Sequence, residues 1–182
     1  MPYRLTNIRV LIIDENPPVR LLMRSLLLDL GIGMIDMAAH AEQGWDFYNR
    51  FRPDMIVLDW PATDRTALDF IQRVRNHPDS PLPHVPIIVV TGHSPAERVK
   101  QIRDAGASDL IIKPFTMHSL VSHLIHIVET PRAFVRTPYF VGPDRRRRDH
   151  DITAERRSSY DDSEIPTALS AMEALKGKSD ML

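Results

Sequence analysis

The segment DMIVLDW, residues 54–60, joins four consecutive apolar residues directly to a carboxylate. The apolar run at 55–58 is short and partly β-branched, which is typical of a strand that is buried on both faces. Asp59 follows at its carboxyl end, where an unpaired buried charge would be costly. An acid in this position is either the cap of a turn or part of a functional site. The residues at the ends of the other expected strands distinguish a turn cap from a functional site.

Four other apolar runs of similar length accompany this one, and we predict a strand at each: residues 9–13, 34–38, 86–90 and 110–112. Segments of helical periodicity separate them, and we expect helices at residues 17–30, 41–51, 65–76, 95–105 and 116–129. Strand and helix thus alternate five times. Because parallel strands need crossovers that cover both sheet faces, we predict an α/β fold. The expected form is a flavodoxin-like, doubly wound sheet of five parallel strands in the order 2-1-3-4-5.

The first expected helix has clear end signals. Asn16 would be its N-cap, Pro17 can occupy its first turn, and Gly31 would end it. In such a helix four leucines would share one face, namely Leu21, Leu22, Leu26 and Leu30.

Composition separates the chain into two parts. Its 182 residues are 43% hydrophobic and 26% charged, which suits one domain at residues 1–130 and an appendage at 131–182. The formal net charge of −1 gives no overall attraction to nucleic acid or to an anionic membrane. The absence of cysteine excludes disulfides and thiol catalysis. No apolar run is long enough for a signal peptide or a membrane span, so we expect a cytoplasmic protein without membrane contact.

Residues whose side chains can bind ligands or take part in a reaction stand at the ends of the expected strands: Asp14 and Glu15, Asp59, Thr91, and Lys113. In an open parallel sheet, ligands bind at this carboxyl edge. Three carboxylates gathered there repel one another, so a cation is required. Lys113 is one candidate and Mg²⁺, which prefers oxygen ligands, is the other. This equipment suits the transfer of a phosphoryl group onto Asp59 as nucleophile.

The chain resembles the receiver domain of bacterial two-component response regulators across about residues 8–129. Four stretches carry the resemblance in this order: IIDEN, IVLDW, VVTGH and AGASDLIIKPF. The resemblance implies that Asp59 is the phosphorylated aspartate, that Thr91 is the hydroxyl that senses the phosphoryl group, and that Lys113 pairs with that group. It also implies a cis peptide bond between Lys113 and Pro114.

The same resemblance implies how Mg²⁺ is held. Asp14 and Glu15 match the acidic pair that binds the ion, together with Asp59 itself. A backbone carbonyl two residues past the phosphorylated aspartate completes the protein ligands, and in this chain it belongs to Pro61.

Three features depart from the family pattern. Glu15 replaces the commoner aspartate, and the loop after Asp59 lacks the usual Met-Pro-x-Met-Asp-Gly pattern. Leu110 stands where the family usually has the aromatic residue that moves inward when Thr91 turns toward the phosphate. The switch pair would therefore be Thr91 and Leu110. These departures leave open a second interpretation, a phosphate-independent adaptor on a receiver scaffold.

The appendage offers no second core and is expected to be mostly disordered, because it is rich in Pro, Arg, Asp and Ser. A short helix is predicted near residues 166–176. One docking motif is predicted, with an apolar part and an arginine run: Tyr139, Phe140, Arg145, Arg146, Arg147 and Arg148. The arginines suggest a third and weaker interpretation, a regulator that binds RNA or DNA. We favour a solvated charge run instead and do not expect a nucleic-acid partner.

Together these expectations describe a stand-alone response regulator in a phosphorelay. It would receive its phosphoryl group from a sensor histidine kinase or a histidine phosphotransfer protein. It would signal to a downstream protein by direct contact. We do not expect an enzyme, apart from Mg²⁺-dependent phosphorylation and dephosphorylation of its own aspartate.

Overall fold

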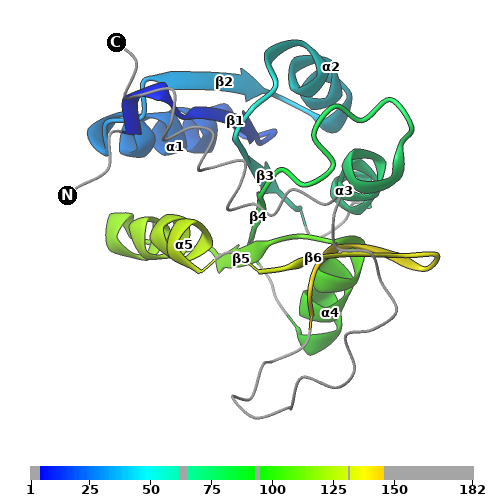
Figure 1. Cartoon of the computed structure of the whole chain (residues 1–182). Helices are drawn as coiled ribbons and strands as arrows, with labels where there is room; N and C mark the ends of the chain where they lie inside the picture. Colours follow the sequence, from blue (N-terminus) through cyan, green and yellow to red (C-terminus); the bar gives the residue numbers. More distant parts are fainter. Residues whose placement is uncertain (1–4, 62–64, 93–94, 131, 146–182) are drawn as a thin grey trace.

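A computed structural model describes residues 5–61, 65–92, 95–130 and 132–145 of the chain. Its central sheet has five parallel strands in the order β2-β1-β3-β4-β5, which confirms the predicted winding (Figure 1). The strands are β1 (Arg9–Ile13), β2 (Met34–Ala38), β3 (Met55–Asp59), β4 (Ile87–Thr91) and β5 (Asp109–Ile112). The helices are α1 (Pro17–Asp29), α2 (Ala41–Phe51), α3 (Thr66–Asn76), α4 (Ala96–Ala105) and α5 (Met117–Glu129). A short 3-10 helix, η1 (Leu5–Asn7), precedes β1.

The register of the sheet brings the carboxyl ends of its central strands to one edge. Ile13 at the end of β1 lies opposite Leu58 on β3, and Asp59 lies opposite Val90 on β4. Thr91 lies opposite Ile112, the last residue of β5. The residues that follow these positions therefore meet at the same edge.

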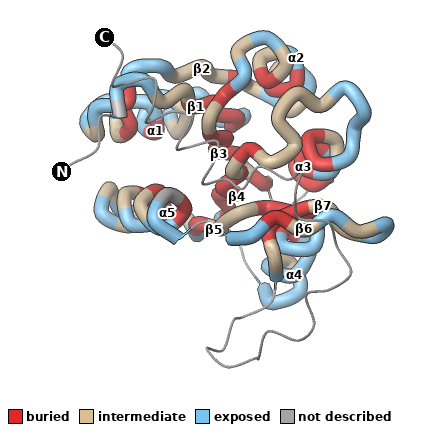
Figure 2. The backbone as a smooth tube through the Cα atoms, viewed as in Figure 1, coloured by how far each residue is buried: buried red, intermediate tan, exposed pale blue. Residues whose placement is uncertain are grey.

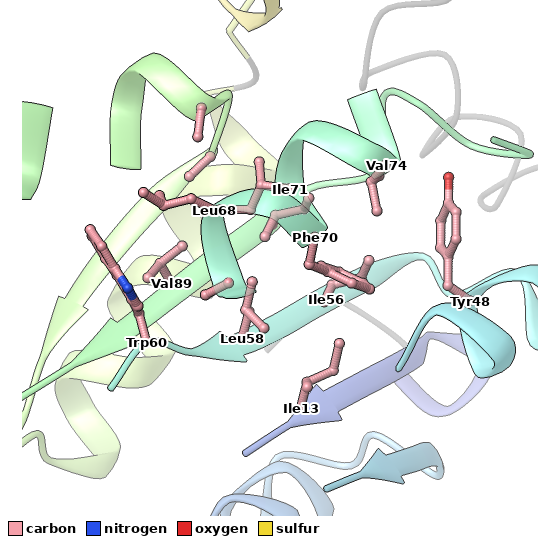
Figure 3. Packing of buried hydrophobic residues seen from close by; sticks show 14 of the residues in the cluster. Ile13, Tyr48, Ile56, Leu58, Trp60, Leu68, Phe70, Ile71, Val74 and Val89 are labelled. Carbon is pink, nitrogen blue, oxygen red and sulfur yellow. The ribbon is translucent and has the colours of Figure 1, made fainter. Parts of the chain in front are cut away.

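Two apolar layers cover the sheet, and the buried residues run through its middle (Figure 2). Alternate residues of each strand face opposite layers, as the period of a strand requires. Figure 3 shows the layer under α2, α3 and α4, where Ile56 and Leu58 of β3 meet Phe70 and Ile71 of α3. The opposite layer lies under α1 and α5, with Val57 and other strand residues. Burial on both faces explains why the strands are nearly unbroken apolar runs.

Helix α1 begins and ends as predicted but turns a different face inward. The Asn16 side chain accepts a hydrogen bond from the backbone N–H of Val19, and Gly31 has a φ of 86° just past the helix. The buried residues are Met23 and Leu27, with Leu26 and Leu30 partly buried beside them. Leu21 and Leu22 are exposed. Because leucines occur on several sides of this helix, the sequence did not show which of them contact the sheet.

A β-hairpin that the sequence did not predict follows α5. Strands β6 (Phe134–Thr137) and β7 (Phe140–Pro143) pair antiparallel and lie beside α3 and α4 (Figure 1). Phe134 is buried, and the edge of its ring meets His84 at a centroid distance of 4.2 Å. The guanidinium of Arg75, itself fully buried, lies 5.3 Å from the centroid of the same ring. Within the appendage, residues 134–143 therefore form a hairpin packed on the domain, which the expected disorder did not include.

Arg75 connects the hairpin to the domain, and backbone carbonyls accept the hydrogen bonds of its guanidinium. Its Nε donates to the carbonyl of Gly106 at 2.9 Å, and its Nη1 donates to the carbonyls of Pro83 and Val85 at 2.6 and 2.8 Å. Burial lowers the pKa of Arg75 to about 9. Even so the guanidinium stays charged at neutral pH, held by carbonyl dipoles.

Other expectations for the appendage fall outside the described residues. These are the helix near residues 166–176 and the side chains of Arg146, Arg147 and Arg148. Within the described part of the chain, no helix is both long and apolar enough to cross a membrane.

Candidate functional site

A lysine bridges two carboxylates at the carboxyl edge of the sheet. The Nζ of Lys113, just after β5, lies 2.8 Å from Oδ1 of Asp59 and 3.1 Å from Oδ2 of Asp14. The two acids come from the ends of β3 and β1, and their side chains are only 15% and 7% exposed. Three of the predicted site residues, separated by up to 99 positions in the sequence, therefore meet in one place.

The other predicted ligands line a small pocket beside this bridge. Its wall includes all four residues predicted to hold the metal: Asp14, Glu15, Asp59 and Pro61. Glu15 is exposed, whereas Asp14 is buried. Oδ1 of Asp14 also accepts a hydrogen bond of 2.8 Å from the backbone N–H of Asn16, which fixes the carboxylate orientation. The pocket thus presents oxygen atoms from three carboxylates at one edge of the sheet.

Backbone geometry at the end of β5 helps to position the lysine. The peptide bond between Lys113 and Pro114 is cis, as the resemblance implied. The backbone N–H of Lys113 donates to the carbonyl of Thr91 at 2.8 Å, which anchors the segment to β4.

The pKa values of Asp59 and Lys113 are both raised, but for different reasons. Burial is the main cause that raises the pKa of Asp59, and the charges of Asp14 and Glu15 raise it further; together they outweigh the lowering effect of Lys113. For Lys113, burial works to lower the pKa, but its hydrogen bond to Asp59 and the charges of Asp59 and Asp14 prevail and raise it. The lysine is therefore firmly protonated, while the negative charge of Asp59 is only partly compensated.

Thr91 is fully buried, and its hydroxyl donates to the backbone carbonyl of Trp60 at 3.1 Å. The hydroxyl thus contacts the residue directly after Asp59. Leu110 is partly buried and packs on the layer that also contains Val89. Strand alternation places Thr91 and Val89 on the same sheet face, so the predicted switch pair shares that face.

Arg98 was not among the residues predicted for the site. It lies on α4, its guanidinium stands 3.8 Å from the centroid of the Trp60 ring, and its Nη2 donates to the carbonyl of Pro61. Periodicity predicts a helix at this position, but no sequence signal says that this arginine would reach across to the segment after Asp59. Trp60 itself is buried in the layer under α3, near Leu68 (Figure 3).

Arg20 is a second basic residue that sequence reasoning missed. Its Nη1 donates to the backbone carbonyl of Asp14 at 2.5 Å. It lies in the first turns of α1, and nothing in the sequence of that helix indicates that its side chain contacts the Asp14 backbone.

The donor set fits a hard divalent cation. Three carboxylates and Pro61 line the pocket and carry the oxygen atoms that Mg²⁺ prefers. His40 lines it too, but its Nδ1 already accepts a hydrogen bond from the backbone N–H of Gln43. Lys113 bridges two of the carboxylates. Among the described residues, however, no three His, Cys, Asp or Glu side chains form a ready-made metal cluster. An ion here would therefore combine few protein ligands with water, which is common for Mg²⁺.

The predicted docking motif of the appendage divides into two environments. Tyr139, at the tip of the hairpin, is 98% exposed. Phe140 is partly buried, and the guanidinium of Arg145 lies 3.8 Å from its ring centroid. Arg145 also forms an ion pair of 2.5 Å with Asp104 of α4. Phe140 and Arg145 thus contact this chain itself.

Comparison with solved structures places the fold among known receivers. Chemotaxis protein CheY4 of Vibrio cholerae aligns with a TM-score of 0.59 at 23% identity and covers 66% of this chain and 98% of its own. A CheY-like receiver domain protein from Methanospirillum hungatei aligns with a TM-score of 0.58 at 21% identity, over 65% of this chain and 91% of its own.

Sequence comparison agrees with the structural one. Chemotaxis protein CheY-3 of Vibrio cholerae is 28% identical over 123 residues, 68% of this chain and 93% of its own. Chemotaxis protein CheY of Pseudomonas aeruginosa is 27% identical over 121 residues, 66% of this chain and 96% of its own. Residues 10–125 match the family described as the response regulator receiver domain. The chain therefore belongs to the response regulator receiver domain family.

Proposed function

We propose that this protein is a response regulator that receives a phosphoryl group on Asp59 and signals through protein contacts. The observation that carries the proposal is the Lys113 bridge, with 2.8 Å to Asp59 and 3.1 Å to Asp14. A carboxylate nucleophile beside a fixed ammonium group at a polar sheet edge has the parts that phosphoryl transfer requires.

In the proposed reaction an oxygen of Asp59 forms a bond to phosphorus while the bond from phosphorus to the donor breaks. The bonding electron pair leaves with the donor, an imidazole of a sensor histidine kinase or of a histidine phosphotransfer protein. Lys113 neutralises charge on the transferring oxygens. Mg²⁺, held by Asp14, Glu15, Asp59 and the Pro61 carbonyl, would supply further charge neutralisation when bound.

The signal would arise from a shift between two conformations of the same fold. Thr91 is the proposed sensor, because its hydroxyl already contacts the backbone beside Asp59. Turning toward a phosphoryl group would exchange that hydrogen bond for a stronger one with a charged oxygen. Leu110, on the same sheet face, would then repack without the aromatic ring that the family usually has.

Phosphorylation by a small donor tests the proposal. We expect the wild-type protein to gain one phosphoryl group when it is incubated with acetyl phosphate and Mg²⁺, as seen by intact mass. Asp59→Ala should gain none, and Lys113→Ala should react at least about tenfold more slowly, since transition-state charge stabilisation by one group contributes on this scale. Asp46→Asn removes an exposed carboxylate of α2 and should react like the wild type. A wild-type protein that gains no mass, or an Asp59→Ala variant that still does, would refute the assignment.

A phosphate-independent adaptor is the second candidate. It is favoured by one observation, that Arg98 donates a hydrogen bond to the same Pro61 carbonyl that the metal would use. An adaptor of this kind would bind its protein partner equally well with and without Mg²⁺ and acetyl phosphate. The mass measurement separates the two candidates, because an adaptor would gain no phosphoryl group.

A further inference from the structure

Arg98 links helix α4 to the two residues that follow Asp59. Its guanidinium stacks over the Trp60 ring at 3.8 Å from the centroid, and its Nη2 donates to the Pro61 carbonyl. Trp60 is 3% exposed, so this stacking is largely withdrawn from water. Cation–π contacts are stronger when they are desolvated. These contacts join Arg98 to the Trp60 ring and to the Pro61 backbone, that is, to the segment directly after the proposed nucleophile.

Pro61 stands between the acidic pocket and α4. The residue lies in the wall of the pocket, where a divalent cation would need oxygen ligands, and its carbonyl already accepts a hydrogen bond from the Arg98 guanidinium. A carbonyl oxygen has two lone pairs, but two positive groups that share one oxygen repel each other strongly at such short range. Full occupation by one of them therefore weakens the other.

We propose that Arg98 is a positioning residue that competes with the divalent cation for the Pro61 carbonyl, and so couples the filling of the site to helix α4. This inference rests on the proposed function, because it takes the acidic pocket as the cation site. With the site empty, Arg98 holds the carbonyl toward α4. When the cation takes the carbonyl, Arg98 withdraws, and α4 loses one of its attachments to β3.

Linkage makes the coupling reciprocal. If Arg98 and the cation oppose each other at one oxygen, removing Arg98 must tighten cation binding by the same factor by which the cation weakens the Arg98 contact. The departure from the usual loop pattern after Asp59 then has a physical consequence. It supplies a carbonyl and an indole ring to a guanidinium on α4, which ties the loop to a helix that borders the proposed switch face.

A Mg²⁺ titration of the full chain tests the competition. The Trp45→Phe background leaves Trp60 as the single tryptophan, so its fluorescence reports on the residue beside Asp59. In this background we expect Arg98→Ala to lower the Kd for Mg²⁺ by about tenfold, within the usual range of coupling between two sites. Arg98→Lys retains the charge but not the planar fork, so we expect a smaller change. Calorimetric titration of the same proteins measures the Kd without relying on the indole.

Lys100→Ala is the matched control, since it removes one positive charge from an exposed position of the same helix. We expect its Kd for Mg²⁺ to stay within about twofold of the parent, because the charge is solvent-screened. An equal tightening in Lys100→Ala would show that general electrostatics, and not the Pro61 contact, sets the affinity. An Arg98→Ala variant with an unchanged or higher Kd would overturn the inference.

Hydrogen exchange supplies the reciprocal measurement. Mg²⁺ should speed amide exchange in peptides covering residues 96–105 in the parent protein and have no such effect in Arg98→Ala. An equal response in both proteins would contradict the coupling. Failure of the proposed function would look different, since the parent would then show no saturable Mg²⁺ response, or one that Asp59→Asn leaves unchanged. That outcome would remove the proposed function and this inference together.

Discussion

The residue-scale feature that matters most is an incompletely compensated carboxylate. Asp59 and Asp14 share one ammonium group, Lys113, at 2.8 and 3.1 Å. Burial and the second carboxylate together raise the pKa of Asp59 despite this partner. The ionised carboxylate of Asp59 is therefore held at a cost to the folded state, as is common at functional sites.

Removal of that charge should stabilise the protein. A carboxyl group whose pKa is raised in the folded state lowers the free energy of unfolding once it ionises. The penalty is fully present above the folded pKa and vanishes as the pH falls below the ordinary value of 3.8. We expect Asp59→Asn to raise the free energy of unfolding by about 1 kcal/mol at pH 7 in EDTA, seen as a Tm about 2–4 °C higher.

The pH dependence distinguishes this cause from a general gain in packing. The difference in Tm between Asp59→Asn and wild type should shrink as the pH is lowered from 7 toward 4. Asp46→Asn, at an exposed position of α2, should change the Tm little at either pH. A lower Tm for Asp59→Asn at pH 7 would show that the lysine compensates the carboxylate fully.

The sequence could predict which side chains meet at the sheet edge, because chain order and sheet winding together fix where strand ends lie. Asp14, Asp59 and Lys113 each stand directly after a buried apolar run, so the predicted winding was enough to bring them together. Arg98 could not be found in this way, since its role depends on the direction of one long side chain on a helix. Nothing in the spacing of α4 distinguishes it from its exposed neighbours.

At the scale of elements, strands and helices were predicted within a residue or two of their ends, while the hairpin was missed. The central strands β1, β3 and β4 are buried apolar runs rich in β-branched residues, whereas the edge strands β2 and β5 are only partly buried. Helices such as α1 have Asn, Pro and Gly signals at their ends. The hairpin strands have four residues each and lie in a segment that composition predicts to be irregular. They owe their order to tertiary contacts with Arg75 and His84, which local sequence cannot show.

Close backbone contact between Gly142 and Gly106 allows the hairpin to dock. A Cβ atom at Gly142 would lie 2.8 Å from the Cα of Gly106 and 2.8 Å from the Phe140 ring. Gly106 has a φ of 101° just after α4, which favours glycine. The backbone at this contact has no room to give way without moving β7.

Gly142→Ala should therefore displace the hairpin and lower the free energy of unfolding by about 1–3 kcal/mol, the usual cost of forcing an extra carbon into a packed site. Chemical denaturation measures this change. Gly33→Ala is the control, because its added Cβ would have only an ordinary contact, 3.5 Å from the carbonyl of Thr6. Equal stability of the two variants would show that the hairpin contributes nothing to the domain.

At the scale of the whole molecule, helix α4 connects two regions of the protein, the acidic pocket and the hairpin. The acidic pocket occupies the carboxyl edge of the sheet, and the hairpin lies against the carboxyl ends of α3 and α4, where Gly106 leads into the start of β5. Helix α4 contacts both, through Arg98 toward Pro61 and through Asp104 toward Arg145. A change at the proposed phosphoacceptor site that moves α4 would therefore reach the base of the appendage.

Chemical trapping of the modified residue identifies the phosphoacceptor. Sodium borohydride reduces an acyl phosphate on aspartate to the alcohol of homoserine and leaves unmodified carboxylates intact. After treatment with acetyl phosphate and Mg²⁺, we expect homoserine at position 59 in the peptide that spans the end of β3. Reduction at Asp14 or at any other carboxylate, or none in protein that has gained a phosphoryl group, would contradict this assignment.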